Sequence, residues 1–184
     1  MKALKTDFKD LKIINAKKFK DARGEFREIF RKTITKEKKN FIFTCFSRSK
    51  KNVLRGLHLQ KPNAQGKYVS VIKGKILDVV VDLRRKSKTY KKHFKIILSS
   101  NNCKSIYVPG GFAHGFLSLE KDNMIVYHLT NYRSEKDEIG IKWNDKVLNI
   151  KWGKKKPSLS VKDATKNISF LDFENKYNQL WQNY

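Results

Sequence analysis

The chain has 184 residues, 39% of them hydrophobic and 12% aromatic, which suits one domain with a sizeable core and excludes a largely disordered chain. No apolar run reaches the ~18–20 residues that a membrane helix needs, and residues 1–7 lack the apolar stretch of a signal peptide. We therefore expect a single domain over residues 1–184, located in the cytoplasm and without membrane contact.

The formal net charge is +25, from 42 basic and 17 acidic residues, and such a balance attracts nucleic acid or phosphorylated ligands. The lysines are scattered along the chain, however, and no basic helix, zinc finger or RNA-binding aromatic motif accompanies them. We expect a solvated basic surface and no nucleic-acid partner. The two cysteines, Cys45 and Cys103, belong to no paired metal-ligand spacing, which predicts reduced thiols.

Short apolar runs rich in β-branched and aromatic residues follow one another along the chain, separated by turn residues. Gly74 predicts a tight hairpin within residues 72–76, and Pro109-Gly110-Gly111 predicts another turn. About ten strands at this spacing indicate an all-β sandwich or barrel. The predicted strands are residues 11–15, 25–31, 41–47, 53–60, 68–72, 75–83, 94–98, 105–108, 116–119 and 124–131.

A helix is predicted only near the end of the chain. Within residues 171–181, four apolar side chains recur at helical spacing: Phe173, Tyr177, Leu180 and Trp181. The pattern predicts a short amphipathic helix that packs on the barrel or on a partner chain.

Two histidines stand in surroundings that suit a ligand pocket. A lone strand histidine is most simply a hydrogen-bonded structural residue. In Arg55-Gly56-Leu57-His58-Leu59-Gln60, however, strand alternation places Gly56, His58 and Gln60 on one face, which favours a pocket lining. His114 follows the Pro109 turn among small residues, which predicts an imidazole at a barrel mouth. Tyr127 lies among apolar residues, where a structural and a functional tyrosine are both compatible with the pattern.

Together, these motifs resemble the dTDP-4-dehydrorhamnose 3,5-epimerase family over about residues 10–165. The resemblance implies a cupin jelly-roll barrel that works as a homodimer with exchanged strands, on a nucleotide-sugar and without a cofactor. The motifs that carry it are Arg23-Gly24-Glu25-Phe26-Arg27-Glu28, Arg55-Gly56-Leu57-His58, Asn63-Ala64-Gln65-Gly66-Lys67, Asp78-Val79-Val80-Val81-Asp82-Leu83-Arg84, the segment 108–116, Ile141-Lys142-Trp143-Asn144-Asp145 and Leu159-Ser160-Val161-Lys162-Asp163.

The implied reaction converts dTDP-4-dehydro-6-deoxyglucose to dTDP-4-dehydrorhamnose through an enolate. The ketone at carbon 4 acidifies the hydrogens on carbons 3 and 5, so inversion needs a base, an acid on the opposite face and a stabiliser for the enolate oxygen. His58 is the expected base, because imidazole accepts protons near neutral pH. The resemblance makes Asp163 its partner. We expect Tyr127 to be the acid and Lys67 the stabiliser.

The resemblance also implies a set of substrate-binding residues, in which arginines suit phosphate oxygens through their fork of donors. His114 is expected close to His58. No metal site is expected, because His58 is followed by Leu59 and Gln60 rather than by further ligands, which leaves too few ligands. The implied binding residues are Arg23, Phe26, Glu28, Arg55, His114, Glu138 and Lys162.

Several positions depart from the family pattern and leave the substrate open. Phe43 and Cys45 replace an amide pair that helps to hold the nucleotide-sugar, and Arg133 replaces the second ring of an aromatic pair. His128 stands where a lysine is usual, and Leu59 where an aromatic is common. A guanosine or cytidine nucleotide, a heptose, or epimerisation at carbon 3 alone are therefore alternatives.

Three alternatives differ in reaction or in class. A 3,4-ketoisomerase of nucleotide-sugars would use the same scaffold, but Tyr127 favours an epimerase, since inversion needs a donor on the far face. A metal-dependent cupin oxygenase would need bound transition metal. A basic nucleic-acid or sugar-binding module without catalysis would show a steep salt dependence of its affinity for DNA.

Overall fold

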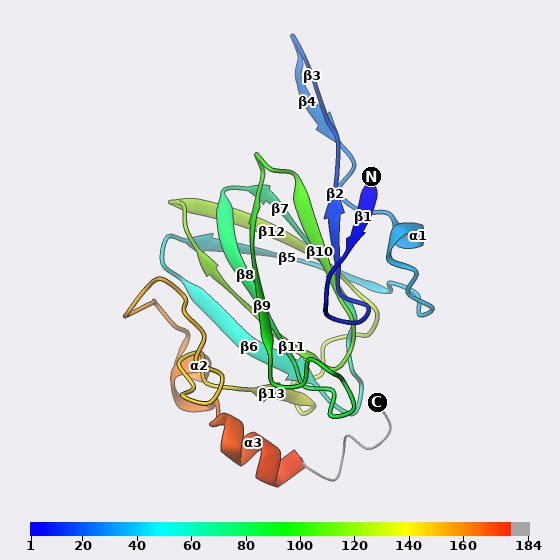
Figure 1. Ribbon diagram of the computed structural model, residues 1–184. Helices are drawn as coiled ribbons and strands as arrows, with labels where there is room; N and C mark the ends of the chain where they lie inside the picture. Colours follow the sequence, from blue (N-terminus) through cyan, green and yellow to red (C-terminus); the bar gives the residue numbers. More distant parts are fainter. Residues whose placement is uncertain (178–184) are drawn as a thin grey trace.

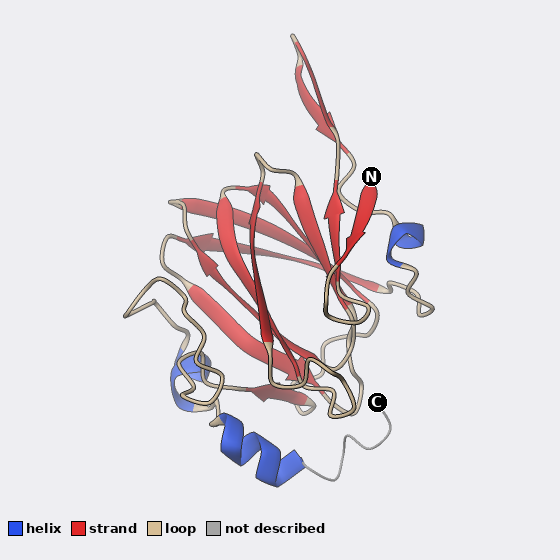
Figure 2. Cartoon of the chain, viewed as in Figure 1, coloured by secondary structure: helices blue, strands red, loops and turns tan. Residues whose placement is uncertain are grey.

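The computed structural model describes residues 1–177. Within them, two antiparallel sheets face each other around the core, and a small hairpin stands away from both (Figure 1, Figure 2). From β5 onward the chain crosses repeatedly between the two sheets, as in a jelly roll. Their strand orders are β1 (Lys2–Lys5), β2 (Lys12–Asn15), β10 (Lys104–Val108), β7 (Lys67–Lys73), β12 (Asp122–Leu129) and β5 (Phe43–Lys50) in the six-stranded sheet, and β13 (Glu138–Gly140), β6 (Leu54–Gln60), β11 (Phe112–Ser118), β8 (Lys75–Asp82) and β9 (His93–Ser99) in the five-stranded sheet.

Each apolar run predicted as a strand overlaps a strand of the structure, so the all-β prediction is confirmed. Three strands were not predicted. Two of them, β1 and β3, are lysine-rich and largely exposed, and the third, β13, has only three residues. The short helices α1 (Lys32–Thr35) and α2 (Val161–Thr165) were also missed. Strand β11 begins at Phe112, earlier than predicted, because its small residues pair with β8 in unbroken register.

The five-stranded sheet is buried on both faces, as strand β8 shows. Val79 and Val81 point to a core cluster that also contains Phe170 and Phe173. Val80 points to the opposite side, into the cluster between the two sheets. This double burial explains why β8 is a nearly continuous run of β-branched residues rather than an alternating one.

Helix α3 (Phe170–Tyr177) covers the outer face of the five-stranded sheet (Figure 1). Phe170 and Phe173 are almost fully buried there, which confirms the predicted C-terminal helix and its packing on the barrel. The predicted helix extended to Trp181, but Leu180 and Trp181 lie outside the described residues. Within residues 1–177, no helix is long and apolar enough to cross a membrane.

The third antiparallel pair forms a hairpin, called the arm below, that comprises β3 (Lys18–Asp21) and β4 (Gly24–Arg27) and projects from the barrel edge (Figure 1). Two of its aromatic side chains are exposed, Phe19 at 53% and Phe26 at 71%. The base of the arm is fastened by Arg27, whose guanidinium donates to backbone carbonyls of the body. The arm therefore presents apolar surface at a distance from the core of its own chain.

Strand β6 contains one extra residue opposite β11. His58 pairs with His114, but Arg55, three residues earlier, pairs with Phe116, only two residues from His114. This bulge lies at Gly56, which has φ +121. As a result Arg55 and His58 face the same side of the sheet, whereas regular alternation had predicted Gly56 in place of Arg55.

We predict that Gly56→Ala destabilises the fold by about 3 kcal/mol, through positive φ and a clash. An added Cβ would lie 2.5 Å from the Gly115 Cα. Urea unfolding measures the loss, and Gly153→Ala is the control, because Gly153 has φ +76 with nothing within 4 Å of an added Cβ. Equal losses in the two variants would show that the close contact with β11 is unimportant.

Candidate active site

A cavity of about 380 Å³ opens between the two sheets. Strands β5, β7 and β12 form one wall, β6 and β11 form the other, and α2 lies at the edge. Four of the five departures noted in the sequence also line it: Phe43, Cys45, Leu59 and Arg133. Eight of the eleven predicted site residues line the cavity: Arg55, His58, Lys67, His114, Tyr127, Glu138, Lys162 and Asp163.

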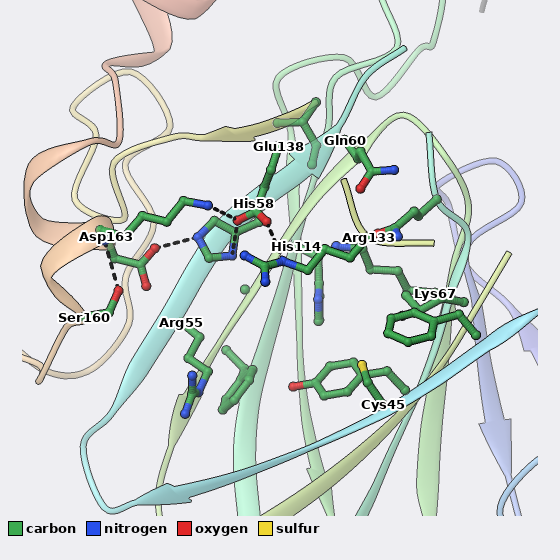
Figure 3. A pocket seen from close by; sticks show the side chains of 18 residues that line it. Cys45, Arg55, His58, Gln60, Lys67, His114, Arg133, Glu138, Ser160 and Asp163 are labelled. Atoms are coloured by element: carbon green, nitrogen blue, oxygen red, sulfur yellow. Dashed lines mark hydrogen bonds and ion pairs between the residues drawn. The ribbon is translucent and has the colours of Figure 1, made fainter. Parts of the chain in front are cut away.

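His58 and Asp163 meet at one edge of the cavity, although 105 residues separate them. The distance between His58 Nε2 and Asp163 Oδ1 is 2.5 Å (Figure 3). Ser160 caps α2 by accepting the Asp163 backbone N–H at 3.0 Å, which fixes the first turn of the helix and the carboxylate on it. Ser160 stands three residues before Asp163, which is a sequence signal for this cap, but α2 was not predicted.

The pKa of Asp163 lies below its ordinary value. Burial alone raises it, but the hydrogen bond and charge of His58, with bonds from Ser160 and Asn167, outweigh burial. An ionised carboxylate only accepts hydrogen bonds, so His58 carries its proton on Nε2. The ring's other nitrogen, Nδ1, is then free to accept a proton.

Glu138 lies beside that second nitrogen. Its Oε1 is 3.9 Å from His58 Nδ1 and 2.8 Å from Lys162 Nζ, and its Oε2 accepts from Arg133 Nε at 3.0 Å (Figure 3). Burial raises the pKa of Glu138, but Lys162, His58 and Arg133 together hold it below its usual range. Glu138 thus links the His58 ring to the two cations Lys162 and Arg133.

Tyr127 comes from β12, in the sheet opposite His58, so the two side chains line different walls of the cavity. Its hydroxyl lies 3.1 Å from Ser47 Oγ. Burial raises the pKa of Tyr127 well above its ordinary value, and the Ser47 hydrogen bond offsets only part of this rise. The phenol therefore stays protonated at neutral pH and can donate.

Lys67 projects into the cavity from β7. Burial lowers the pKa of its ammonium, and the carboxylates of Glu138 and Asp78 offset part of that effect. Its Nζ forms no hydrogen bond or ion pair with the residues that the structure describes. A partly desolvated cation in this state is available to an anionic ligand group.

A second histidine–carboxylate pair lies beside the first. His114 is paired with His58 across strands β11 and β6, and its Nε2 is 2.8 Å from Asp78 Oδ2. Both side chains of this pair are buried. Asp78 belongs to one of the family motifs in the sequence but had no predicted role. The signal was a carboxylate inside the apolar strand Lys75–Asp82, where burial demands a partner.

Three predicted binding residues do not reach this cavity in their own chain. Arg23 and Phe26 are on the arm, where Arg23 pairs with Asp21 at 2.6 Å. Glu28 follows the arm and pairs with Arg31 at 2.6 Å. In this chain β3 and β4 pair with each other and extend away from the barrel, so the predicted binding role of these three residues stays a prediction.

The described part of the chain contains no group of three or more His, Cys, Asp or Glu side chains arranged to hold a metal ion. Both cysteines are unpaired; Cys103 is buried, and Cys45 is half-buried at the wall of the cavity. Burial raises the pKa of the Cys45 thiol, so it is protonated at neutral pH.

A family model for dTDP-4-dehydrorhamnose 3,5-epimerase matches residues 5–169. The chain belongs to this family. A dTDP-4-dehydrorhamnose 3,5-epimerase of Shigella flexneri is 42% identical over 168 residues, which cover 89% of this chain and 93% of the relative. The match confirms the resemblance that the motifs indicated.

Solved structures agree with that assignment. The dTDP-4-dehydrorhamnose 3,5-epimerase of Elizabethkingia anophelis superposes with a TM-score of 0.85 at 38% identity, over 94% of this chain and 97% of that one. The dTDP-6-deoxy-D-glucose-3,5-epimerase of Legionella pneumophila, solved with dTDP-4-keto-L-rhamnose, gives 0.84 at 39% identity over 88% and 89%. These likenesses confirm the predicted cupin jelly roll.

We predict that His58→Gln raises the pKa of Asp163, because the histidine's hydrogen bond and charge no longer oppose burial. In the wild type the lowered pKa means that ionised Asp163 stabilises the fold above the unfolded pKa. This contribution is lost as the pH falls through the folded pKa. Carboxyl ¹³C NMR titration measures the shift, with His93→Gln as the control. An unchanged titration in His58→Gln would contradict the coupling.

Proposed function

We propose that the chain converts dTDP-4-dehydro-6-deoxyglucose to dTDP-4-dehydrorhamnose by inverting carbons 3 and 5. The observation that carries this proposal is the His58 imidazole held by Asp163, with Tyr127 on the facing wall. Membership of the epimerase family and the Legionella complex with dTDP-4-keto-L-rhamnose support the choice of substrate.

The first step is proton removal by His58. Its Nδ1 takes the hydrogen from the carbon beside the ketone, and the C–H electrons move to the carbonyl oxygen to give an enolate. The imidazolium that forms is stabilised by Asp163 on Nε2 and by Glu138 near Nδ1. The His58–Asp163 pair thus supplies an oriented base.

The second step is proton return from the opposite wall. Tyr127 donates its phenolic proton to the enolate carbon, and the enolate electrons form the new C–H bond on the other face. The phenolate then regains a proton from solvent, and the imidazolium loses its proton to solvent. Each inverted carbon consequently carries a solvent-derived hydrogen.

Charge on the enolate oxygen needs a donor while the proton is absent. Lys67 is the proposed stabiliser, because its ammonium lines the cavity without a protein partner among the described residues. His114, oriented by Asp78, lies beside His58 and can hydrogen-bond the substrate. Arg55 and Lys162 offer further positive charge for the diphosphate.

We expect His58→Ala and Asp163→Asn to lower turnover by about 10²- to 10⁴-fold with the fold retained. Tyr127→Phe is expected to spare hydrogen exchange with solvent better than net inversion, because the base remains. Incubation in deuterated water followed by NMR measures both quantities, with His93→Gln as the control. Near-normal turnover in both the His58 and the Asp163 variants would refute the base assignment.

The same assay on a panel of 4-keto nucleotide-sugars tests the alternatives. Deuterium at carbon 3 alone would indicate a 3-epimerase, and a faster reaction with a guanosine- or cytidine-linked sugar, or with a heptose, would change the substrate. Carbonyl migration would indicate a ketoisomerase. Activity lost to a strong chelator would indicate a metal-dependent cupin, and steeply salt-dependent DNA affinity would indicate a nucleic-acid binder.

We also propose that the enzyme is a homodimer in which the arms are exchanged. The arm carries Arg23 and Phe26 away from the cavity of its own chain, and its phenylalanines are exposed. Phe46 and Ile72 are also exposed, at 55% and 39%, on the outer face of the six-stranded sheet, where a second copy can cover them. Crossing arms would bring Arg23, Phe26 and Glu28 to the partner's cavity.

Mixing two inactive variants tests this exchange. We expect Arg23→Gln/Phe26→Ala and His58→Ala to be weakly active alone and to recover about a quarter of wild-type activity after joint refolding at equal amounts. Half of the dimers are then mixed, and each has one cavity with both His58 and an intact arm. No recovery, although mixed dimers form, would show that each arm serves its own chain.

We also propose that residues 1–184 form one domain, and that the enzyme is cytoplasmic and needs no cofactor. The family match over residues 5–169 supports the single domain, since it spans both sheets, the arm and α2.

A further inference from the structure

Arg133 enters the cavity from a backbone that is held on both sides. The Gln60 side chain donates to the carbonyl of Tyr132 at 3.1 Å and accepts the N–H of Ser134 at 2.9 Å. Gln60 is buried and lies two residues after His58 on β6. The position of Arg133 is therefore tied to the strand that carries the proposed base.

The Arg133 side chain reaches across the cavity toward Glu138, beside His58 (Figure 3). Its Nε donates to Glu138, and its Nη1 lies 3.2 Å from Oε1 of Glu135, a side chain that is 80% exposed. Ion pairs with such exposed carboxylates contribute little stability. The guanidinium can exchange Glu135 for ligand oxygens while its backbone stays in place.

The cavity carries an excess of positive charge that matches a diphosphate. The charged side chains lining it are two arginines, two lysines and two carboxylates, so two positive charges are in excess when Lys67 is protonated. A diphosphate that links a nucleoside to a sugar carries two negative charges, and arginine binds such oxygens through two parallel N–H groups. The six side chains are Arg55, Lys67, Arg133, Lys162, Glu138 and Asp163.

An aromatic pair lies beside Arg133, one of its rings on the preceding residue. The rings of Phe43 and Tyr132 lie 5.9 Å apart at an interplanar angle of 54°. An aromatic surface stacks on any base, and the nearby Cys45 thiol is a weak hydrogen-bonding group. This wall therefore offers stacking to a base, while polar contacts can come from Gln65, which also lines the cavity, and from the exchanged arm proposed above.

We propose that Arg133 is a specificity-determining residue that binds the substrate's diphosphate. The inference deepens the proposed function and rests on it for the class of ligand. It assigns to Arg133 a contact with the substrate rather than a structural ion pair.

Calorimetric binding of inorganic pyrophosphate, dTDP and GDP at fixed ionic strength tests the proposal. We expect Arg133→Gln to weaken pyrophosphate and dTDP by a similar factor, about ten- to a hundredfold. Arg133→Lys, which keeps the charge without the fork, should fall between. Lys136→Gln is the matched control, since Lys136 is exposed on the same loop outside the cavity, and it should change binding by less than about twofold. Arg133→Gln should weaken GDP by the same factor as dTDP, since both nucleotides carry the diphosphate.

Several results would overturn the inference. If Arg133→Gln weakened dTDP binding and left pyrophosphate binding unchanged, Arg133 would contact the base. Equal losses of affinity in Arg133→Gln and Lys136→Gln would mean that the net positive charge of the protein, rather than a direct contact, attracts the ligand. A loss confined to one of the two nucleotides would likewise place Arg133 on the base. Epimerisation is assayed separately: inactive wild type with the expected binding pattern contradicts the proposed function alone, and active enzyme with unaltered Arg133→Gln binding contradicts this inference alone.

Discussion

The contact between His58 and Asp163 is the interaction on which the candidate site depends. A carboxylate with a lowered pKa holds the proton on one ring nitrogen and leaves the other nitrogen basic toward the cavity. The pair joins β6 to α2, so the barrel wall and the helix at its edge share one polar link. Glu138 extends that link to Lys162 and Arg133, which makes the mouth of the cavity a continuous network of charges.

The two faces of the five-stranded sheet explain how such a polar network is held rigidly. Its outer face is covered by α3 and the segment before it, and its inner face meets the opposite sheet, so β6, β8 and β11 are fixed from both sides. Polar side chains that emerge from these strands cannot move far without disturbing packed neighbours. The second pair, His114 with Asp78, is oriented by the same packing.

Much of this arrangement could be predicted from local patterns. The all-β class followed from apolar runs and turns, and the residues around His58 and His114 indicated a pocket because strand alternation and small neighbours are local properties. Asp163 could be named only through the family resemblance, since a contact across 105 residues leaves no trace in spacing. Arg55 was missed as the neighbour of His58 on the strand face, because a single extra residue in β6 breaks the alternation. The arm residues were recognised, but no pattern in one chain shows that they lie outside its own cavity.

Because of the bulge in β6, the number of residues in that strand decides which of its side chains face the cavity. Between Arg55 and His58 the strand is out of phase with its neighbour, and the positive φ of Gly56 absorbs the mismatch where its backbone lies against Gly115. Deleting one residue from β6 would restore regular pairing with β11. Either the Arg55 guanidinium or the His58 imidazole would then point into the apolar layer on the outer face of the sheet. The set of side chains on this wall of the cavity thus depends on the offset in pairing between β6 and β11 as well as on which residues the strands contain.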